Sequence, residues 1–125
     1  MANLHPDLVS RARQLSRDNP QDLISVYSIN DDTCLFASPS HFEILGYPYP
    51  DMLGQNWQSF VATQDRPHAA LAGSDAILMG ASIEFSLLIL SKSGELVPVR
   101  ATTWTEIDLD TGWKVLFFQA HCRRA

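Results

Sequence analysis

Glycine and proline divide residues 34–60 into segments that are too short to form one long helix. The stretch begins with Cys-Leu-Phe, which are good strand residues. Ser38-Pro39 then places an N-cap hydroxyl before the one helix position where proline is favoured. Gly46 and Gly54 can each end a helical turn in the left-handed conformation. We therefore expect a strand followed by short helical turns, which together form a cup over a sheet where a small molecule can be held.

The remaining segments are an N-terminal helix, a longer internal helix and further strands. Residues 4–17 carry leucine and alanine at helical spacing with arginines on the other side, which predicts an amphipathic helix. Alternating apolar residues and turn signals predict a longer helix at 64–79 and strands at 23–29, 34–37, 82–90, 96–107 and 113–120. The last of these strands is apolar on both faces, so we expect it to be central in the sheet.

Five short motifs follow one another in a fixed order: Ser38-Pro39, Leu45-Gly46-Tyr47, Asp51-Met52-Leu53-Gly54, Gln64-Asp65-Arg66 and Lys92-Ser93-Gly94-Glu95. In this order the motifs resemble the signature of the PAS domain family, which consists of small sensory α+β modules, over about residues 22–120. The resemblance implies a five-stranded antiparallel sheet with short helices and one longer helix packed on one face. We expect three parts along the chain. Residues 1–21 should form an N-terminal amphipathic helix and a connector, residues 22–121 the PAS-like domain, and residues 122–125 a tail toward a missing output region.

Composition excludes several kinds of partner. The chain has 125 residues with a formal net charge of −5, which argues against nucleic acid and against an anionic membrane surface as partners. No apolar run approaches the ~18 residues of a membrane-spanning helix. Cys34 and Cys122 form no CxxC motif and no disulfide framework, so a reduced, cytoplasmic setting is the natural interpretation.

The expected cup has an identifiable lining. Small residues of one strand should face inward beneath larger residues from the neighbouring strand and the helices. The predicted site consists of Trp57, Phe60, His68, Leu71, Phe85, Leu87, Val99, Ala101, Thr103 and Phe117. Small residues opposite large ones fit either a filled core or a ligand cavity. An empty cavity lowers the stability of the folded state by about 24 cal/mol per Å³. We therefore slightly favour a filled or nearly filled core over a ligand cavity.

Three cofactor chemistries can be weighed through the resemblance. Flavin adduct formation in the light-sensing branch needs a cysteine directly after Gly54-Gln55-Asn56, and Trp57 stands there instead, so we exclude the adduct. Haem-binding members use a histidine on the longer helix, but His68 comes one position too early, and one residue rotates a helical side chain by about 100°. Haem through His68 is therefore a minor alternative. The two cysteines could also sense redox state, but nothing near them in the sequence suggests a lowered thiol pKa.

We find no catalytic set and no metal-ligand spacing. The four histidines show no zinc pattern, and the serines lack a nucleophile elbow or a histidine at a recognisable spacing. We therefore expect a regulatory domain without catalytic residues of its own, although its parent protein could be a kinase.

The opposite face of the sheet should carry Leu88, Leu90, Thr102 and Trp104. An apolar face of this kind needs a cover, which is either helix 4–17, a second copy of the chain, or both. Whether the helix packs on its own domain or in a dimer seam is equally open. We expect a sensory or interaction module of a larger signal-transduction protein, such as a histidine kinase in a two-component system, that binds a small molecule in the cup and forms a homodimer. A ligand-free dimerisation module is the alternative.

Overall fold

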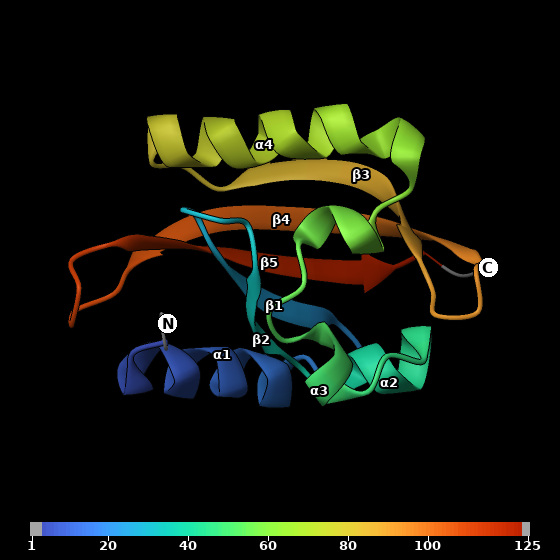
Figure 1. The fold of residues 1–125 in the computed structure, drawn as a ribbon, viewed down its shortest axis with the longest axis horizontal. Coiled ribbons are helices and arrows are strands. Elements are labelled where there is room, and N and C mark those ends of the chain that lie inside the picture. The colour runs from blue at the N-terminus through green and yellow to red at the C-terminus, as the bar shows by residue number, and fades with distance from the viewer. Residues whose placement is uncertain (1–3, 124–125) are drawn as a thin grey trace.

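The computed structural model describes residues 4–123, which form one five-stranded antiparallel sheet with helices on both sides (Figure 1). The strand order in the sheet is β2-β1-β5-β4-β3. In chain order the elements are α1 (Pro6–Asp18), β1 (Leu23–Ser28), β2 (Cys34–Ala37), α2 (Ser40–Leu45), α3 (Tyr49–Met52), η1 (Trp57–Phe60), η2 (Thr63–Asp65), α4 (Arg66–Met79), β3 (Ile83–Leu90), β4 (Leu96–Ile107) and β5 (Lys114–Cys122). The expected α+β architecture is confirmed. The expected tail includes residues 124–125, which lie outside the described residues.

The central position of β5 is confirmed, because this strand pairs with β1 on one side and β4 on the other. Its register with β4 places Phe118 opposite Thr103 and Phe117 opposite Trp104. Directly opposed residues share a face of the sheet, so neighbouring phenylalanines point to opposite faces. The sheet thus has an inner face with Phe118 and an outer face with Phe117.

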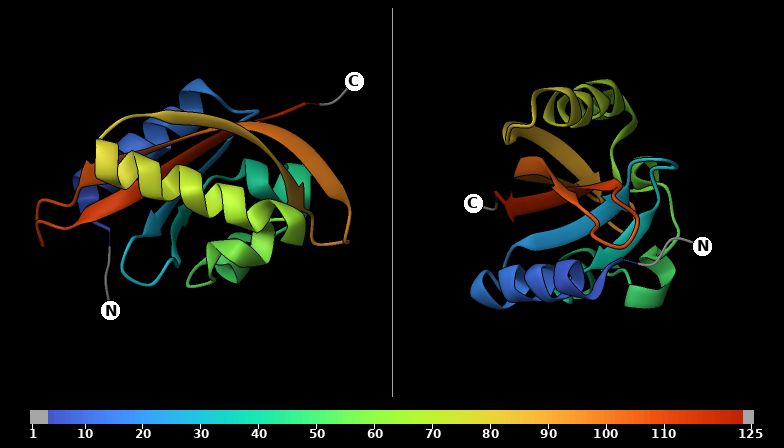
Figure 2. Two further views of the ribbon diagram at one scale, coloured as in Figure 1. Left: turned by 90° about the horizontal axis from the view of Figure 1, so that it is seen from above. Right: turned by 90° about the vertical axis from the view of Figure 1, so that its left-hand side faces the viewer.

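Helix α1 covers part of the outer face of its own sheet. Its buried residues, Leu8 and Ala12, pack against Val26, Phe117 and other buried residues of β1, β2 and β5. Figure 2 shows α1 and α4 on opposite sides of the sheet. Of the two positions left open for the N-terminal helix, the structure shows the one within its own domain.

An ion pair reinforces the attachment of α1 to the sheet. The Arg11 Nε donates to Glu106 Oε2 at 2.5 Å, and the Trp104 indole donates to the same oxygen at 2.9 Å.

Within residues 4–123, no helix is long and apolar enough to cross a membrane.

The punctuated stretch forms the expected short elements β2, α2, α3 and η1. Gly46 and Gly54 take φ angles of 82° and 80°, as their predicted role as helix stops requires. Helix α2 starts later than predicted, because Ser38 does not cap it. Instead, the Ser38 Oγ accepts from the Ile24 backbone N–H at 3.0 Å, and Pro39 occupies the N-cap position of α2.

Helix α4 was predicted from residue 64 but starts at Arg66. Asp65 is the N-cap residue, yet its carboxylate makes no capping hydrogen bond within the helix. It accepts the Leu88 backbone N–H at 2.6 Å instead, which ties α4 to the edge strand β3. The carboxylate therefore satisfies a donor on the open edge of the sheet rather than one at the helix end.

Candidate functional site

A cavity of about 210 Å³ lies between the inner face of the sheet and the helices α2, η1 and α4. Its lining consists of Tyr27, Asp32, His41, Leu45, Met52, Trp57, Gln58, Phe60, Val61, Ala69, Ala70, Gly73, Ser74, Ile77, Phe85, Leu87, Ile89, Thr103, Leu116 and Phe118. The slight preference for a filled core is therefore wrong, and the alternative, a cavity, is what the structure contains.

The small residues of α4 explain why space remains. Ala72 and Ala76 are buried and let the helix sit close to the sheet. The part of the helix that borders the cavity carries Ala69, Ala70, Gly73, Ser74 and Ile77, of which only Ile77 is large. Short side chains on one wall leave room that the aromatic residues of the opposite wall do not fill.

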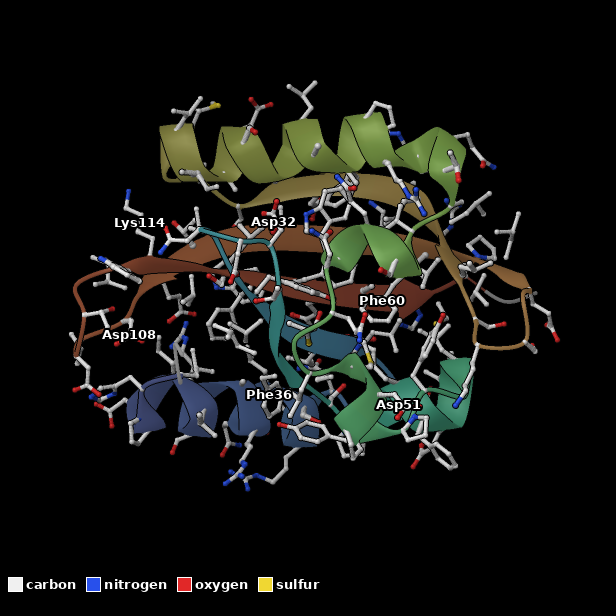
Figure 3. The ribbon with its side chains drawn as sticks, viewed as in Figure 1. Asp32, Phe36, Asp51, Phe60, Asp108 and Lys114 are labelled. Carbon is white, nitrogen blue, oxygen red and sulfur yellow. The ribbon has the colours of Figure 1, made fainter. Side chains whose placement is uncertain are left out.

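Half of the predicted site residues line the cavity. These are Trp57, Phe60, Phe85, Leu87 and Thr103. Figure 3 shows Phe60, from η1, together with Asp32 at the turn between β1 and β2. Val99 and Ala101 are buried in the core beneath the inner face but do not border the cavity.

Two predicted site residues lie elsewhere. Leu71 projects from α4 into solvent and is 61% exposed, because the alanines of α4 face the sheet in place of its leucines. Phe117 is fully buried on the outer face against α1, and its ring lies 5.5 Å from that of Trp104. The inward-facing aromatic residue of this strand is Phe118.

His68 does not border the cavity either. Its Nε2 lies 2.8 Å from the backbone oxygen of Ser86 on β3, and its side chain is about half exposed. A haem ligand needs a free ring nitrogen aimed at the iron, so the placement of His68 does not fit haem. Trp57, which replaces the cysteine needed for a flavin adduct, borders the cavity.

The sequence analysis missed five polar residues of the lining, Tyr27, Asp32, His41, Gln58 and Ser74, of which His41 has a buried ring. It is 4% exposed, lies on α2 and lines the cavity. Its Nδ1 lies 3.0 Å from the carbonyl oxygen of Ser38 and 3.2 Å from the Ser38 Oγ. Burial lowers the pKa of His41 from 6.5 to about 4, so the ring is neutral at neutral pH. Its position four residues before the buried Leu45 was the one available signal, since i and i+4 share a helix face.

Three residues with hydroxyl groups also border the cavity, Tyr27, Ser74 and Thr103. The Thr103 Oγ1 donates to the Phe117 backbone oxygen at 2.8 Å, which leaves its lone pairs available. Burial, and then the neighbouring Cys34 thiol, raise the pKa of the Tyr27 phenol, which therefore keeps its proton. The nearby Ser25 hydroxyl acts in the opposite direction and lowers the pKa of Tyr27. The distance and angle between the two groups do not form a regular hydrogen bond, and within residues 4–123 the fully buried Ser25 Oγ has no partner.

The lining is almost free of charge. Among the lining residues described, Asp32 alone carries a charge at neutral pH, and it lies at the exposed rim. Cys34 lies nearby in the buried core, where burial raises the pKa of its thiol to about 12. A thiol held in its neutral form is a poor nucleophile and a poor redox sensor.

Comparison with known proteins identifies the fold. The sequence pattern described as the PAS fold matches residues 34–108, which is more than half of the chain. None of the curated proteins compared with the chain matches its sequence.

Solved structures of PAS domains share the architecture. The PAS domain of a Colwellia psychrerythraea protein superposes with a TM-score of 0.77 and 13% identity, covering 92% of this chain and 97% of that one. Wild-type Drosophila melanogaster Cycle PAS-B with bound ethylene glycol gives a TM-score of 0.73 and 11% identity, over 81% of this chain and 99% of that one. A tryptophan variant of the same Cycle domain with bound glycerol gives 0.72 and 11%, with the same coverage. The chain belongs to the PAS fold family, whose domains serve as sensory and signalling modules.

Proposed function

We propose that this chain is a sensory module that binds a small organic molecule in the cavity between the sheet and α4. The observation that carries the proposal is the cavity of about 210 Å³, which combines an apolar wall with the buried ring of His41. The cavity opens to solvent at its rim, where Asp32 and Gln58 are exposed, so a ligand that enters it would remove the apolar wall from water.

The proposed output runs through the sheet to its outer face. β5 borders the cavity through Leu116 and Phe118 and contacts α1 through Phe117. A ligand that favours one position of β5 over another would change the packing of α1, and this differential affinity is what a sensor requires. By this proposal the module regulates a larger signal-transduction protein, such as a histidine kinase, and is not itself an enzyme.

The structures of Cycle PAS-B support the binding of small molecules by this fold, since they contain glycerol or ethylene glycol. Both molecules are small, uncharged alcohols. Their chemistry agrees with the nearly uncharged lining of the present cavity.

A second candidate function is homodimerisation through the outer face. α1 packs with β1, β2 and β5, whereas the β3 end of this face keeps Leu88 and Leu90 only half-buried and Pro98 exposed. This strip is mixed in character, because the exposed Glu84–Arg100 ion pair lies on the same face, and an apolar part with a polar border can receive a second copy. A dimer that forms without any ligand would favour the simple association role over the sensory one.

Native mass spectrometry of the purified chain tests both functions. We expect a bound molecule or a ligand-induced rise in melting temperature, and we expect Ala69→Leu, which fills the cavity from α4, to abolish either result. Leu71→Ala is the matched control, because this side chain is exposed on the same helix. A bare polypeptide mass with no stabilisation by any small molecule contradicts the sensory function, and a monomer at all concentrations in light scattering contradicts the dimer.

A further inference from the structure

The hydrogen bonds around His41 determine which ring nitrogen carries the proton. The backbone oxygen of Ser38 can only accept, so the Nδ1 that contacts it at 3.0 Å must donate. The Ser38 hydroxyl cannot take over this role, because its own proton is directed elsewhere. The Ser40 Oγ donates its proton to the Asp22 backbone oxygen at 2.6 Å. In the contact of 2.6 Å between the two serine hydroxyls, the Ser38 Oγ must therefore be the donor and the Ser40 Oγ the acceptor.

The other ring nitrogen is therefore an acceptor. With the proton on Nδ1 and the ring neutral, Nε2 keeps an unshared electron pair. Within residues 4–123, Nε2 has no hydrogen-bond partner, although His41 is 4% exposed and lines the cavity. Among residues 4–123, Ser25 Oγ is the one fully buried side-chain polar atom without a partner, so Nε2 keeps some contact with solvent, and a donating ligand would replace a hydrogen bond to water with one to the protein.

The charges near the cavity exclude an anionic ligand. No lysine or arginine is among the described lining residues, and the one charged residue, Asp32, would repel an anion at the rim. A carboxylate or phosphate would have to lose its water without gaining a counter-ion, which is strongly unfavourable.

The volume sets the size of the ligand. An apolar cavity of about 150 Å³ is large enough to bind benzene. The present cavity of about 210 Å³ has room for one aromatic ring with a substituent.

Building on the proposed ligand-binding function, we infer that the cavity takes an uncharged molecule of about one ring that donates an O–H or N–H hydrogen bond to Nε2 of His41. Phenols and small heteroaromatic N–H compounds belong to this chemical class. The ring of such a ligand would lie against the short side chains of α4, of which Ala69 and Gly73 are part.

Phenol and toluene provide a matched pair of probes, because they have nearly the same shape and only phenol donates a hydrogen bond. Calorimetric titration of the whole chain gives the ratio of the two affinities, in which the contribution of the ring cancels. The variants are His41→Asn, whose amide can still bond to Ser38 but does not reach the place of Nε2, and His41→Gln, whose longer side chain does. We expect His41→Asn to lower the phenol-to-toluene ratio about five- to tenfold, as the loss of one neutral hydrogen bond requires, and His41→Gln to restore most of it.

A second measurement needs no variant. In the long-range proton–nitrogen spectrum of the native chain, the unprotonated nitrogen of His41 should shift on addition of phenol and stay in place on addition of toluene. If both probes bind with an affinity ratio that His41→Asn leaves unchanged, and neither moves this signal, the inference about His41 is overturned while the ligand-binding function stands. Benzoate binding more tightly than phenol overturns the exclusion of anions. If no probe binds and the purified chain carries no ligand, both the inference and the proposed function fail.

Discussion

Acidification should destabilise this domain through His41 well above the pH at which its carboxylates protonate. The folded chain holds the ring neutral with a pKa of about 4, whereas the ordinary value is 6.5. Below the ordinary value the unfolded chain binds a proton that the folded chain excludes, so the stability due to His41 is complete above about pH 6.5 and is lost as the pH falls toward 4. From these two pKa values, the free energy of unfolding should fall by about 2 kcal/mol between about pH 7 and pH 5.

Urea denaturation followed by tryptophan fluorescence at a series of pH values measures this effect. The matched comparison is His41→Asn, which has no group at this position that titrates in the range. Subtracting its pH profile from that of the native chain removes the contributions of the other histidines and of the carboxylates. Asp31 does not interfere, because hydrogen bonds from Thr33 lower the pKa of its carboxylate, so it titrates below this range. Parallel profiles for the two proteins would refute the argument that His41 is buried and neutral.

Two further comparisons use neighbouring or equivalent residues with different surroundings. Phe117→Ala should lower the free energy of unfolding by about 3–5 kcal/mol, as expected for a fully buried ring. It should change ligand affinity less than Phe118→Ala, which removes a ring that borders the cavity; denaturation and calorimetry distinguish them. Gly73→Ala should stabilise α4 by about 0.5–1 kcal/mol, since the added carbon meets Leu116 at an ordinary 3.4 Å. Gly80→Ala should instead destabilise the folded domain by about 1 kcal/mol, because φ is +63° at that position. Thermal unfolding of both variants checks the opposite signs.

The fold could be predicted from the sequence because its strongest signals are local. Gly46 and Gly54 end helical turns through their own backbone conformation, independently of the tertiary structure around them. In β4, the alternation of residue types identifies the two faces without knowledge of the neighbouring strands. The helix starts were harder to predict. Ser38 and Asp65 have the residue types of N-caps, but each accepts a hydrogen bond from a strand distant in sequence, from Ile24 and from Leu88. A local pattern cannot reveal such tertiary competition.

The site was predicted only in part, for two physical reasons. A strand that is apolar on both faces does not reveal which residues point inward, and only the pairing of Phe117 with Trp104 decides it. On α4, hydrophobicity favours Leu71 as an inward residue, but close packing on the sheet selects the small alanines at Ala72 and Ala76. The same selection creates the cavity, so the feature that misled the prediction is also the one that makes room for a ligand.

β5 is the element on which both faces of the domain depend. Phe118 borders the cavity and Phe117 packs against α1, so consecutive residues of one strand connect the proposed ligand to the N-terminal helix. Because the interior around it is densely packed, we expect a ligand that displaces Phe118 to shift the backbone that carries Phe117. β5 also lies between β1 and β4, so its hydrogen bonds spread such a movement across the sheet. Its neighbour β1 is built in the same way, with Tyr27 bordering the cavity and Val26 packed with α1, so two paired strands connect the cavity to the outer face.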